Sequence, residues 1–454
     1  MKNSLTRRRF LGALGTTVAG LAVAPRFAWG KNIAYVTRVA VTQGNNYDRS
    51  YIKEKVQHLF ESLGGISDVV KAGDKVAIKI NLTGGSGNAY SSALHGVPIT
   101  ESMWTHPEVL RAVGELIIDC GVKGSDITFV EALWDDASYN DFGYLAVQQS
   151  LGASKVNLNN PAPYTAFVSK EVGDLKFYYN SFTLNQILAD IDVYVSIPKM
   201  KHHTSAGFTG SLKNQIGITP KQLYVLPSNQ GRREALHSEG GAGEGVHLPR
   251  SICDLNLARP VHLAVIDGIK NAHGGEGVWN PTFQLAEDHV LLAGKEPVST
   301  DTVSAHMIGL DPAADKFPLP QGDVCDNHLY LLHQKGIGTN IMNEIEIVGD
   351  GASLVSVDRP RAESRLPDGF HLNQNFPNPF NPSTMISFVL PRSGRVHAGV
   401  YSVTGEEVDT LVDGDVAGGV HLLQWKPRHC ASGVYFCRVS AGVSTQTIKM
   451  IYQR

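Results

Sequence analysis

Between residues 31 and 350, short apolar runs and longer amphipathic stretches follow one another along the chain. The apolar runs predict buried strands at 75–80, 127–130, 193–197, 261–266 and 289–293. Helical spacing of apolar residues starts after Thr105, a helix-capping residue type, and ends at Gly121, and a further helix is expected near Ser299. This alternation predicts an α/β domain with a mostly parallel sheet and covering helices.

The pattern changes after residue 350. Residues 351–369 are polar and irregular, which is typical of a linker. Five short alternating runs follow within 370–454, at 385–390, 396–401, 420–425, 433–439 and 445–451. Turn signals lie between them at Thr404-Gly405, Asp413-Gly414 and Gly418-Gly419. The second part is therefore expected to be a small C-terminal antiparallel β-sandwich of the immunoglobulin-like type.

A dense polar cluster follows the apolar run at 193–197. Pro198 is expected to end that strand because proline has no N–H for the sheet. The cluster consists of Lys199, Lys201, His202 and His203, and a short helical pattern with Lys213 and Asn214 comes next. Ligands of open α/β sheets bind just beyond the carboxyl ends of strands. Single lysines are mostly solvated and histidine pairs are common on loops, so the functional interpretation rests on the combination.

Polar residues also stand at or past the ends of the other predicted strands. They are Lys79, Asn81, Glu131, Asp267, Glu276 and Asp301. If the strands are parallel and adjacent, these side chains converge on one edge of the sheet. Carboxylates among lysines shift one another's pKa, as acid–base sites and metal sites both require. The alternative is a set of structural ion pairs and helix caps, and Asp301 alone is equally well explained as a cap.

A glycine-rich segment at 228–249 holds His237, Glu239, Glu244 and His247. Such a long glycine-rich stretch inside a compact domain is either a lid or a solvated linker. His247 is the better candidate for contact with a ligand, because it directly precedes a helix start expected at Pro249.

Charge is distributed unevenly along the 454 residues, whose formal net charge is −3. The first thirty residues carry five basic and no acidic side chains, so the body that follows is acidic. An acidic body argues against a nucleic-acid partner. The cysteines are Cys120, Cys253, Cys325, Cys430 and Cys437, and the absence of a C-x-x-C pair means that no iron–sulfur cluster is expected. Cys430 and Cys437 are equally compatible with a disulfide and with buried thiols.

The first thirty residues have the organisation of a cleavable export signal. Basic residues precede an apolar run at 11–24, and Ala28 and Gly30 are the small residues before Lys31. The run is too short and too rich in glycine and alanine for a membrane span, so no transmembrane segment is expected in the mature chain. Thr6-Arg7-Arg8-Arg9-Phe10-Leu11 resembles a twin-arginine signal. This resemblance implies export by the twin-arginine translocase, which carries folded proteins, often with a cofactor already bound.

Three ordered motifs resemble a known family. They are Pro198-Lys199-Met200-Lys201-His202-His203 with Thr209–Gly217, Val265-Ile266-Asp267-Gly268 with Gly275-Glu276-Gly277, and Glu296–Asp301 with Gly309-Leu310-Asp311. In this order they are similar to the family called domain of unknown function 362, over roughly residues 34–350. The resemblance places eight residues on the family's motif positions: Lys199, Lys201, His203, Lys213, Asn214, Asp267, Glu276 and Asp301. It carries no settled activity.

The C-terminal part resembles a sorting domain of type IX secretion cargo. The similar segments are Asn375–Thr384, Val403–Val408 and Ala431–Phe436. The resemblance implies recognition by the type IX secretion machinery and a final location at the cell surface or outside the cell. The alternative is an ordinary carbohydrate- or protein-binding module.

These features favour an exported enzyme that acts on an anionic small molecule. Lysine side chains suit phosphate or carboxylate, so Lys199, Lys201 and Lys213 are expected to neutralise the ligand beside Asn214. Asp267, Glu276 and His203 are expected to bind a divalent metal or to act as acid and base, and Asp301 is a fourth candidate metal ligand. Lys79, Asn81 and Glu131 are candidates for cofactor binding. The alternatives are a non-catalytic binding protein and a redox protein whose cofactor is loaded before export.

Overall fold

The computed structural model describes residues 37–86, 99–225, 234–238, 243–280, 282–355 and, with short gaps, 370–453. Five predictions fall wholly or partly outside these residues. They are the signal at 1–30, most of the linker at 351–369, parts of the segment at 228–249, part of the turn at Gly418-Gly419 and parts of the segment Asn375–Thr384.

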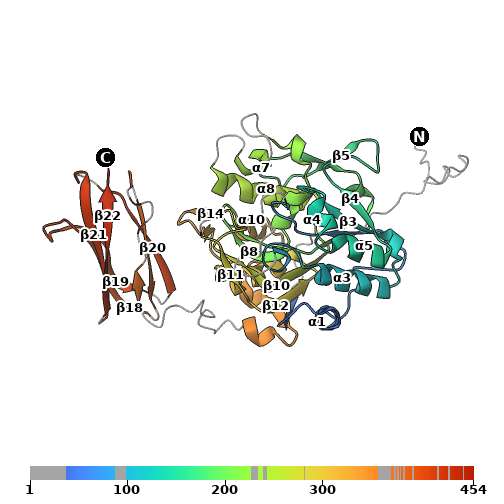
Figure 1. Cartoon of the computed structure of the whole chain (residues 1–454), viewed down its shortest axis with the longest axis horizontal. Coiled ribbons are helices and arrows are strands. Elements are labelled where there is room, and N and C mark those ends of the chain that lie inside the picture. Colours follow the sequence, from blue (N-terminus) through green and yellow to red (C-terminus); the bar gives the residue numbers. More distant parts are fainter. Residues whose placement is uncertain are drawn as a thin grey trace, which may run out of the picture. The chain divides into compact units, whose positions relative to one another are not determined.

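An eleven-stranded sheet forms the middle of the body, and its continuous path runs β15-β1-β12-β10-β7-β2-β3-β4 (Figure 1). The strands of this path are β1 Thr37–Gln43, β2 Val76–Lys79, β3 Ile127–Glu131, β4 Ser154–Asn157, β7 Val193–Ser196, β10 Leu263–His273, β12 Val290–Gly294 and β15 Ile345–Val348. From β10 to β4 all neighbours are parallel, as are β1 and β15. Only β12, among the strands of this path, runs antiparallel to its neighbours. The predicted α/β class with a mostly parallel sheet is confirmed.

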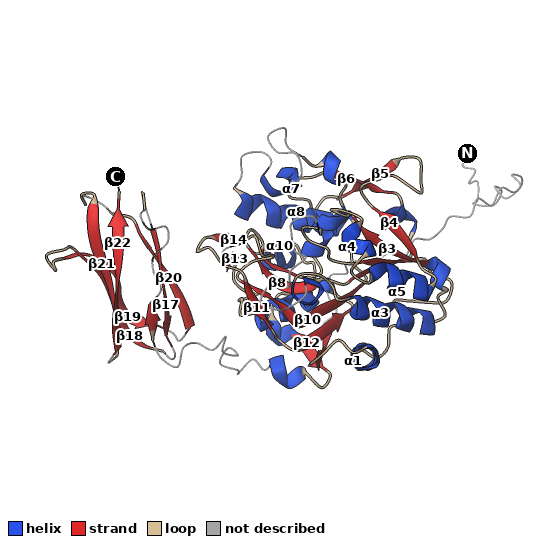
Figure 2. Cartoon of the chain, in the orientation of Figure 1, coloured by secondary structure: helices blue, strands red, loops and turns tan. Residues whose placement is uncertain are grey.

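Helices cover both faces of this sheet (Figure 2). One face packs against α1 Arg49–Ser62, α3 Pro107–Asp119 and α5 Tyr144–Leu151, and the other against α8 Glu244–Ala258, α9 Pro297–Met307 and α10 His328–Gln334. Successive residues of β10 alternate between the two cores, as the period of a strand requires. Both faces are thus dry, and polar side chains in the sheet must find partners inside the protein.

Smaller elements complete the body. They are α2 Ile99–Ser102, α4 Ala137–Asn140, α6 Ile187–Asp190, α7 Glu234–Ser238, β5 Phe167–Glu171, β6 Ser181–Asn185, β8 Lys199–His203, β9 Gly207–Thr209, β11 Gln284–Ala286, β13 Lys316–Pro318 and β14 Val324–Asp326. Strand β8 pairs with β9 and β10, and β11 extends β10. A 3₁₀ segment at Lys213–Ile218 confirms the short helical pattern expected there.

Three local predictions were wrong. The N-cap of α3 is His106, whose ring accepts a hydrogen bond from the Glu108 N–H, and not Thr105. Strand β10 does not end before Asp267 but continues to His273, because β8 supplies a new pairing partner beyond β7. Residues 199–203, the polar cluster to which the sequence analysis assigned no element, form that partner. Helix α8 begins at Glu244 and holds Pro249 inside its second turn.

The C-terminal unit has two antiparallel sheets around one core. The first sheet has the order β16 (His371–Leu372), β17 (Thr384–Leu390) and β20 (Gly419–Trp425). The second has the order β19 (Glu407–Val416), β18 (Gly394–Tyr401), β21 (Gly433–Ala441) and β22 (Ser444–Tyr452). Buried side chains from both sheets form a single cluster that includes Phe388 and Val439. The predicted β-sandwich is confirmed. Asp413-Gly414, expected as a turn, lies within β19 instead.

Two further properties concern the chain as described. No described helix combines the length and apolarity that a membrane crossing needs. None of the five cysteines, all of which lie in the described residues, forms a disulfide, so Cys430 and Cys437 are not bonded to each other.

Candidate functional site

Strand β8 organises the polar residues of the body. It pairs in parallel with β10, where Lys199 lies opposite Asp267 and Lys201 opposite Ala272. It also turns back into β9 through a tight hairpin, in which Gly207 takes a φ of 78° opposite His203. The lysines and histidines after Pro198 are therefore held on a strand inside the protein and not on a surface loop.

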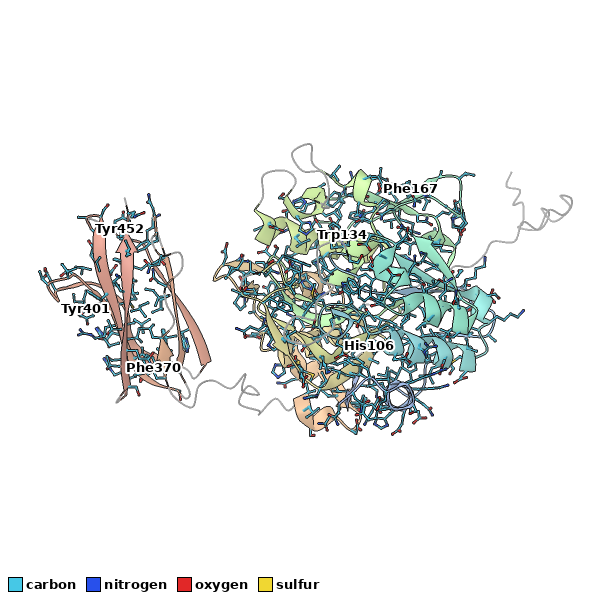
Figure 3. The ribbon with its side chains drawn as sticks, viewed as in Figure 1. His106, Trp134, Phe167, Phe370, Tyr401 and Tyr452 are labelled. Atoms are coloured by element: carbon cyan, nitrogen blue, oxygen red, sulfur yellow. The ribbon has the colours of Figure 1, made fainter. Side chains whose placement is uncertain are left out.

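Lys199 and Asp267 form an ion pair with both side chains fully buried. Lys199 Nζ lies 2.6 Å from Asp267 Oδ2 and also donates to the Tyr47 hydroxyl and to two backbone oxygens. Asp267 accepts further hydrogen bonds from the Tyr47 hydroxyl and the His106 N–H. The ring of His106, labelled in Figure 3, stacks on Tyr47 with 3.7 Å between centroids. Burial lowers the pKa of Lys199, although Asp267 opposes this effect. Every polar atom of the pair is engaged, which is the arrangement of a structural ion pair.

Lys79, Glu131, Asn81 and Asn214 form a second buried network. Lys79 Nζ donates to Glu131 Oε2 at 2.7 Å, to the Ile80 oxygen at 2.5 Å and to Asn214 Oδ1 at 3.2 Å. Asn81 Nδ2 shares the same Asn214 oxygen at 3.2 Å, and Asn214 Nδ2 donates to the Ser196 hydroxyl. These predicted site residues do come together. Their mutual hydrogen bonds tie β2, β3 and the 3₁₀ segment to one another.

Asp301 holds the turn that follows β9. Its Oδ1 accepts from the Ser211 N–H and hydroxyl, both at 2.7 Å, and its Oδ2 accepts from the Leu212 N–H at 2.9 Å. Burial raises the pKa of Asp301 to about 7, against the effect of these hydrogen bonds. The suggestion that Asp301 caps its own helix is wrong, because Glu296 caps α9 by accepting from the Val298 and Ser299 N–H groups.

Lys201 differs from the other two buried lysines. Its side chain is fully buried, yet among the described residues its one acceptor is the backbone oxygen of Met103. An ammonium group has three N–H donors. Burial lowers the pKa of Lys201 to about 7, with the charge of Lys213 adding to the effect and that of Glu276 opposing it. Lys201 is thus a buried amine with spare donors and a proton that it can lose near neutral pH.

His203 and Glu276 both interact electrostatically with Lys201. His203 Nδ1 accepts from the Ser205 N–H at 3.1 Å, so the ring proton of the neutral imidazole is on Nε2. Burial and then the charge of Lys213 lower the pKa of His203 well below its usual range. Burial opposes the ionisation of Glu276. Hydrogen bonds from the Thr204 N–H and hydroxyl and from the Trp279 indole nevertheless hold the pKa of Glu276 well below the usual range.

Other histidines have packing roles. His202 is fixed by a hydrogen bond to the Ile308 oxygen and another from the Gly274 N–H. His247 lies inside α8, where its ring stacks on Tyr178 at 4.5 Å and contacts the Tyr179 hydroxyl. Within the described part of the predicted lid segment, His237 on α7 is a residue whose charge lowers the pKa of His203. Glu239 lies outside the described residues.

The predicted site residues therefore divide into four groups instead of one. Asp267 is paired with Lys199, Asp301 binds the 211–212 turn, and Lys79, Asn81, Glu131 and Asn214 bind one another. Lys201, His203, Lys213 and Glu276 form the group that we call the basic cluster. Of the four candidate metal ligands, His203 and Glu276 interact electrostatically with each other. The described residues contain no group of three or more His, Cys, Asp or Glu side chains placed to hold a metal ion.

Several contacts in these groups were missed by the sequence analysis. Tyr47 and the backbone atoms of Met103 and His106 carry no motif signal of their own. Trp279 lies three residues after Glu276, and its indole N–H donates to Glu276 Oε1 at 3.0 Å. This short spacing could have indicated the contact.

Comparisons with known proteins cover this same part of the chain. The family model described as "Domain of unknown function (DUF362)" matches residues 76–306, slightly more than half of the chain. The thylakoid-associated protein sll1697 of Synechocystis sp. is 27% identical over 281 residues, which are 61% of this chain and 76% of that protein. The lactate racemase apoprotein of Thermoanaerobacterium thermosaccharolyticum aligns with a TM-score of 0.29 and 14% identity, over 55% of this chain and 54% of that one.

Proposed function

Because this chain belongs to the family described as "Domain of unknown function (DUF362)", which assigns no activity, we propose a function from the geometry: an enzyme that binds an anionic small molecule at the basic cluster. Lys201 and Lys213 neutralise the anion, and the Nε2–H of His203 donates a hydrogen bond to it. Lys201 exchanges a proton with the bound molecule, and Glu276 balances the charge of the basic groups around it.

The observation that carries this proposal is the contrast among three buried lysines. Among the described residues Lys199 has four acceptors and Lys79 at least three, so both are satisfied by the protein alone. Lys201 has one acceptor within the same described part of the chain. A buried charge without partners is costly, and anionic oxygens of a ligand would supply the acceptors that the protein withholds.

Acid–base chemistry is favoured by the same group. A catalytic acid or base works best when its pKa lies near the working pH. The pKa of Lys201, about 7, meets this condition. A preparation that retains an anion but never converts any anionic substrate would favour the alternative of a non-catalytic binding protein.

Phosphate affinity should depend on the protonation of Lys201. We expect binding, measured by titration calorimetry, to weaken as the pH rises through about 7, because the amine then loses the charge that attracts the anion. Lys201→Met should weaken phosphate binding roughly ten- to hundredfold, the range for a hydrogen bond between charged groups. Lys71→Met, a change at an exposed lysine, serves as the control. Equal affinity on both sides of pH 7 and in both variants would contradict the proposal.

The proposal includes a divalent metal that is held by two protein ligands instead of four. His203 Nε2 and the Glu276 carboxylate are the two candidate ligands that interact with each other, so the bound anion itself must supply further ligands. Metal analysis of natively exported protein tests this point. A metal that copurifies with the wild type and is lost in Glu276→Gln supports it, and a metal-free active protein refutes it.

We further propose that export uses both ends of the chain. Arg7 and Arg8 would direct the folded body to the twin-arginine translocase, and residues 370–454 would then be read by the type IX secretion machinery. The two-sheet fold of the C-terminal unit is compatible with a separate address module.

Changing both Arg7 and Arg8 to Lys should abolish export, because the adjacent arginines form the recognised signal. Removing 370–454 should leave the body in the periplasm instead of at the cell surface. Cell fractionation followed by immunodetection measures both effects, with Arg26→Lys as the matched control. Unchanged fractionation of the double variant would contradict twin-arginine export.

A further inference from the structure

The loop that joins β10 to β11 (Figure 1) presents an exposed tryptophan in direct contact with the basic cluster. The side chain of Trp279 is 42% exposed. Its indole N–H donates to Glu276 Oε1 at 3.0 Å, which fixes the direction of the ring. A tryptophan that is held by its N–H and still exposes much of its surface has the properties of a binding surface, because one part of it is polar and anchored while the ring is apolar.

Gly277 supports this ring from below. A Cβ atom on residue 277 would overlap three consecutive atoms of the six-membered ring, Cζ2, Cη2 and Cζ3, almost equally. The similar overlap with all three atoms places a face of the ring, and not its edge, over the glycine. A side chain at residue 277 would therefore push the indole away from Glu276, so the absence of a side chain at Gly277 is what lets Trp279 take this position.

The same loop is bonded to the end of the strand that carries the lysines. Glu276 Oε2 accepts hydrogen bonds from the N–H and the hydroxyl of Thr204, both at 3.1 Å, and Thr204 directly follows His203 at the end of β8. The negative charge of Glu276 also acts on His203 and on Lys201. Trp279 is thus connected to the basic groups through a single carboxylate, whose two oxygens bind the indole and the turn between β8 and β9.

We infer that Trp279 stacks on an aromatic ring of the ligand, so that the substrate class is an anion that carries an aromatic ring. This inference rests on the proposed function, because the basic cluster binds the negative charge while the indole binds the ring. Stacking suits this side chain, since aromatic rings pack on an indole face in an offset arrangement without using its N–H. A saturated ring of similar size lacks the π-system and gains less from the same contact.

Titration calorimetry on the full chain with inorganic phosphate, phenyl phosphate and cyclohexyl phosphate tests the inference. We expect the wild type to bind phenyl phosphate roughly five- to hundredfold more tightly than inorganic phosphate, the range for stacking of a ring on an aromatic side chain. Trp279→Ala should abolish this preference. Gly277→Ala should weaken it although the indole is still present, because the added methyl group displaces the ring.

Trp134→Ala is the matched control. Trp134 is 36% exposed, similar to Trp279, but Lys221 Nζ lies over its ring at 4.8 Å from the centre. The preference for phenyl phosphate should survive this change. Trp279→Leu, which keeps an apolar side chain, should lose the preference in the same way as Trp279→Ala and covers the case in which the alanine variant does not fold.

The outcomes separate this inference from the proposed function. Equal affinity for phenyl and cyclohexyl phosphate, or an undiminished preference in the Trp279 variants, overturns the stacking. Binding of inorganic phosphate without any preference for phenyl phosphate rejects the ring site and keeps the anion site. If none of the three anions binds the wild type, both the ring site and the anion site are rejected.

Discussion

Replacing Asp267 by alanine is expected to lower the free energy of unfolding by about 3–5 kcal/mol. The change leaves the ammonium of Lys199 fully buried without its charge partner and removes the acceptor used by the Tyr47 hydroxyl and the His106 N–H. Urea denaturation followed by circular dichroism measures the effect, with the midpoint and slope compared between variant and wild type.

The matched control is Glu346→Ala. Glu346 pairs with Arg38 at 2.7 Å, but the two side chains are 42% and 52% exposed. Solvent-exposed ion pairs contribute at most about 1 kcal/mol. If both variants lose the same small amount of stability, Asp267 is not the structural partner that its contacts indicate.

The second large effect concerns the pH dependence of stability and Asp301. A carboxyl group whose pKa is raised by folding contributes stability that is present below its unfolded pKa and lost as the pH rises through the folded value. For Asp301 this window runs from about 4 to about 7. The loss is on the order of a few kcal/mol, since one pKa unit corresponds to about 1.4 kcal/mol.

Asp301→Asn should remove this loss. An asparagine can keep its oxygen on the Ser211 N–H and hydroxyl, as the protonated acid does, but it cannot ionise. Unfolding midpoints measured across the window should therefore fall for the wild type and stay flatter for Asp301→Asn. Asp68→Asn, at an exposed pair with Lys295, should keep the wild-type slope. The same slope in all three proteins would show that Asp301 does not titrate as described.

The fold class was predictable because both sheet faces are dry. Strands buried on both sides appear as short apolar runs, and the amphipathic helices that cover them have their own period. The antiparallel direction of β12 was not predictable, because an apolar sequence does not show whether a strand is parallel or antiparallel to its neighbours. The length of β10 was hidden for a related reason, because its second half pairs with β8, whose lysines and histidines resemble a loop.

Sequence analysis could name candidate residues for the site, but it could not show how they group in space. The sequence places Lys199 and Lys201 two residues apart on one motif and gives them the same expected role. What separates them is the number of acceptors within reach, which depends on Tyr47 and on backbone oxygens of Glu101, Met103 and Lys270. Backbone atoms have no residue-type signal, so only the fold could show that one lysine is satisfied and the other is not.

The pairing of β1 with β15 brings the first and last strands of the body together at one edge of the sheet, with Thr37 opposite Ile345. The chain therefore enters and leaves the body at the same edge of the sheet, although at opposite ends of the two parallel strands, and β12 lies between this edge and the β10 strand that supports β8. Such a domain suits circular permutation. A flexible linker of roughly six to ten residues would join residue 355 to residue 37. New chain ends opened at the exposed Gly64 turn would leave β8 unchanged.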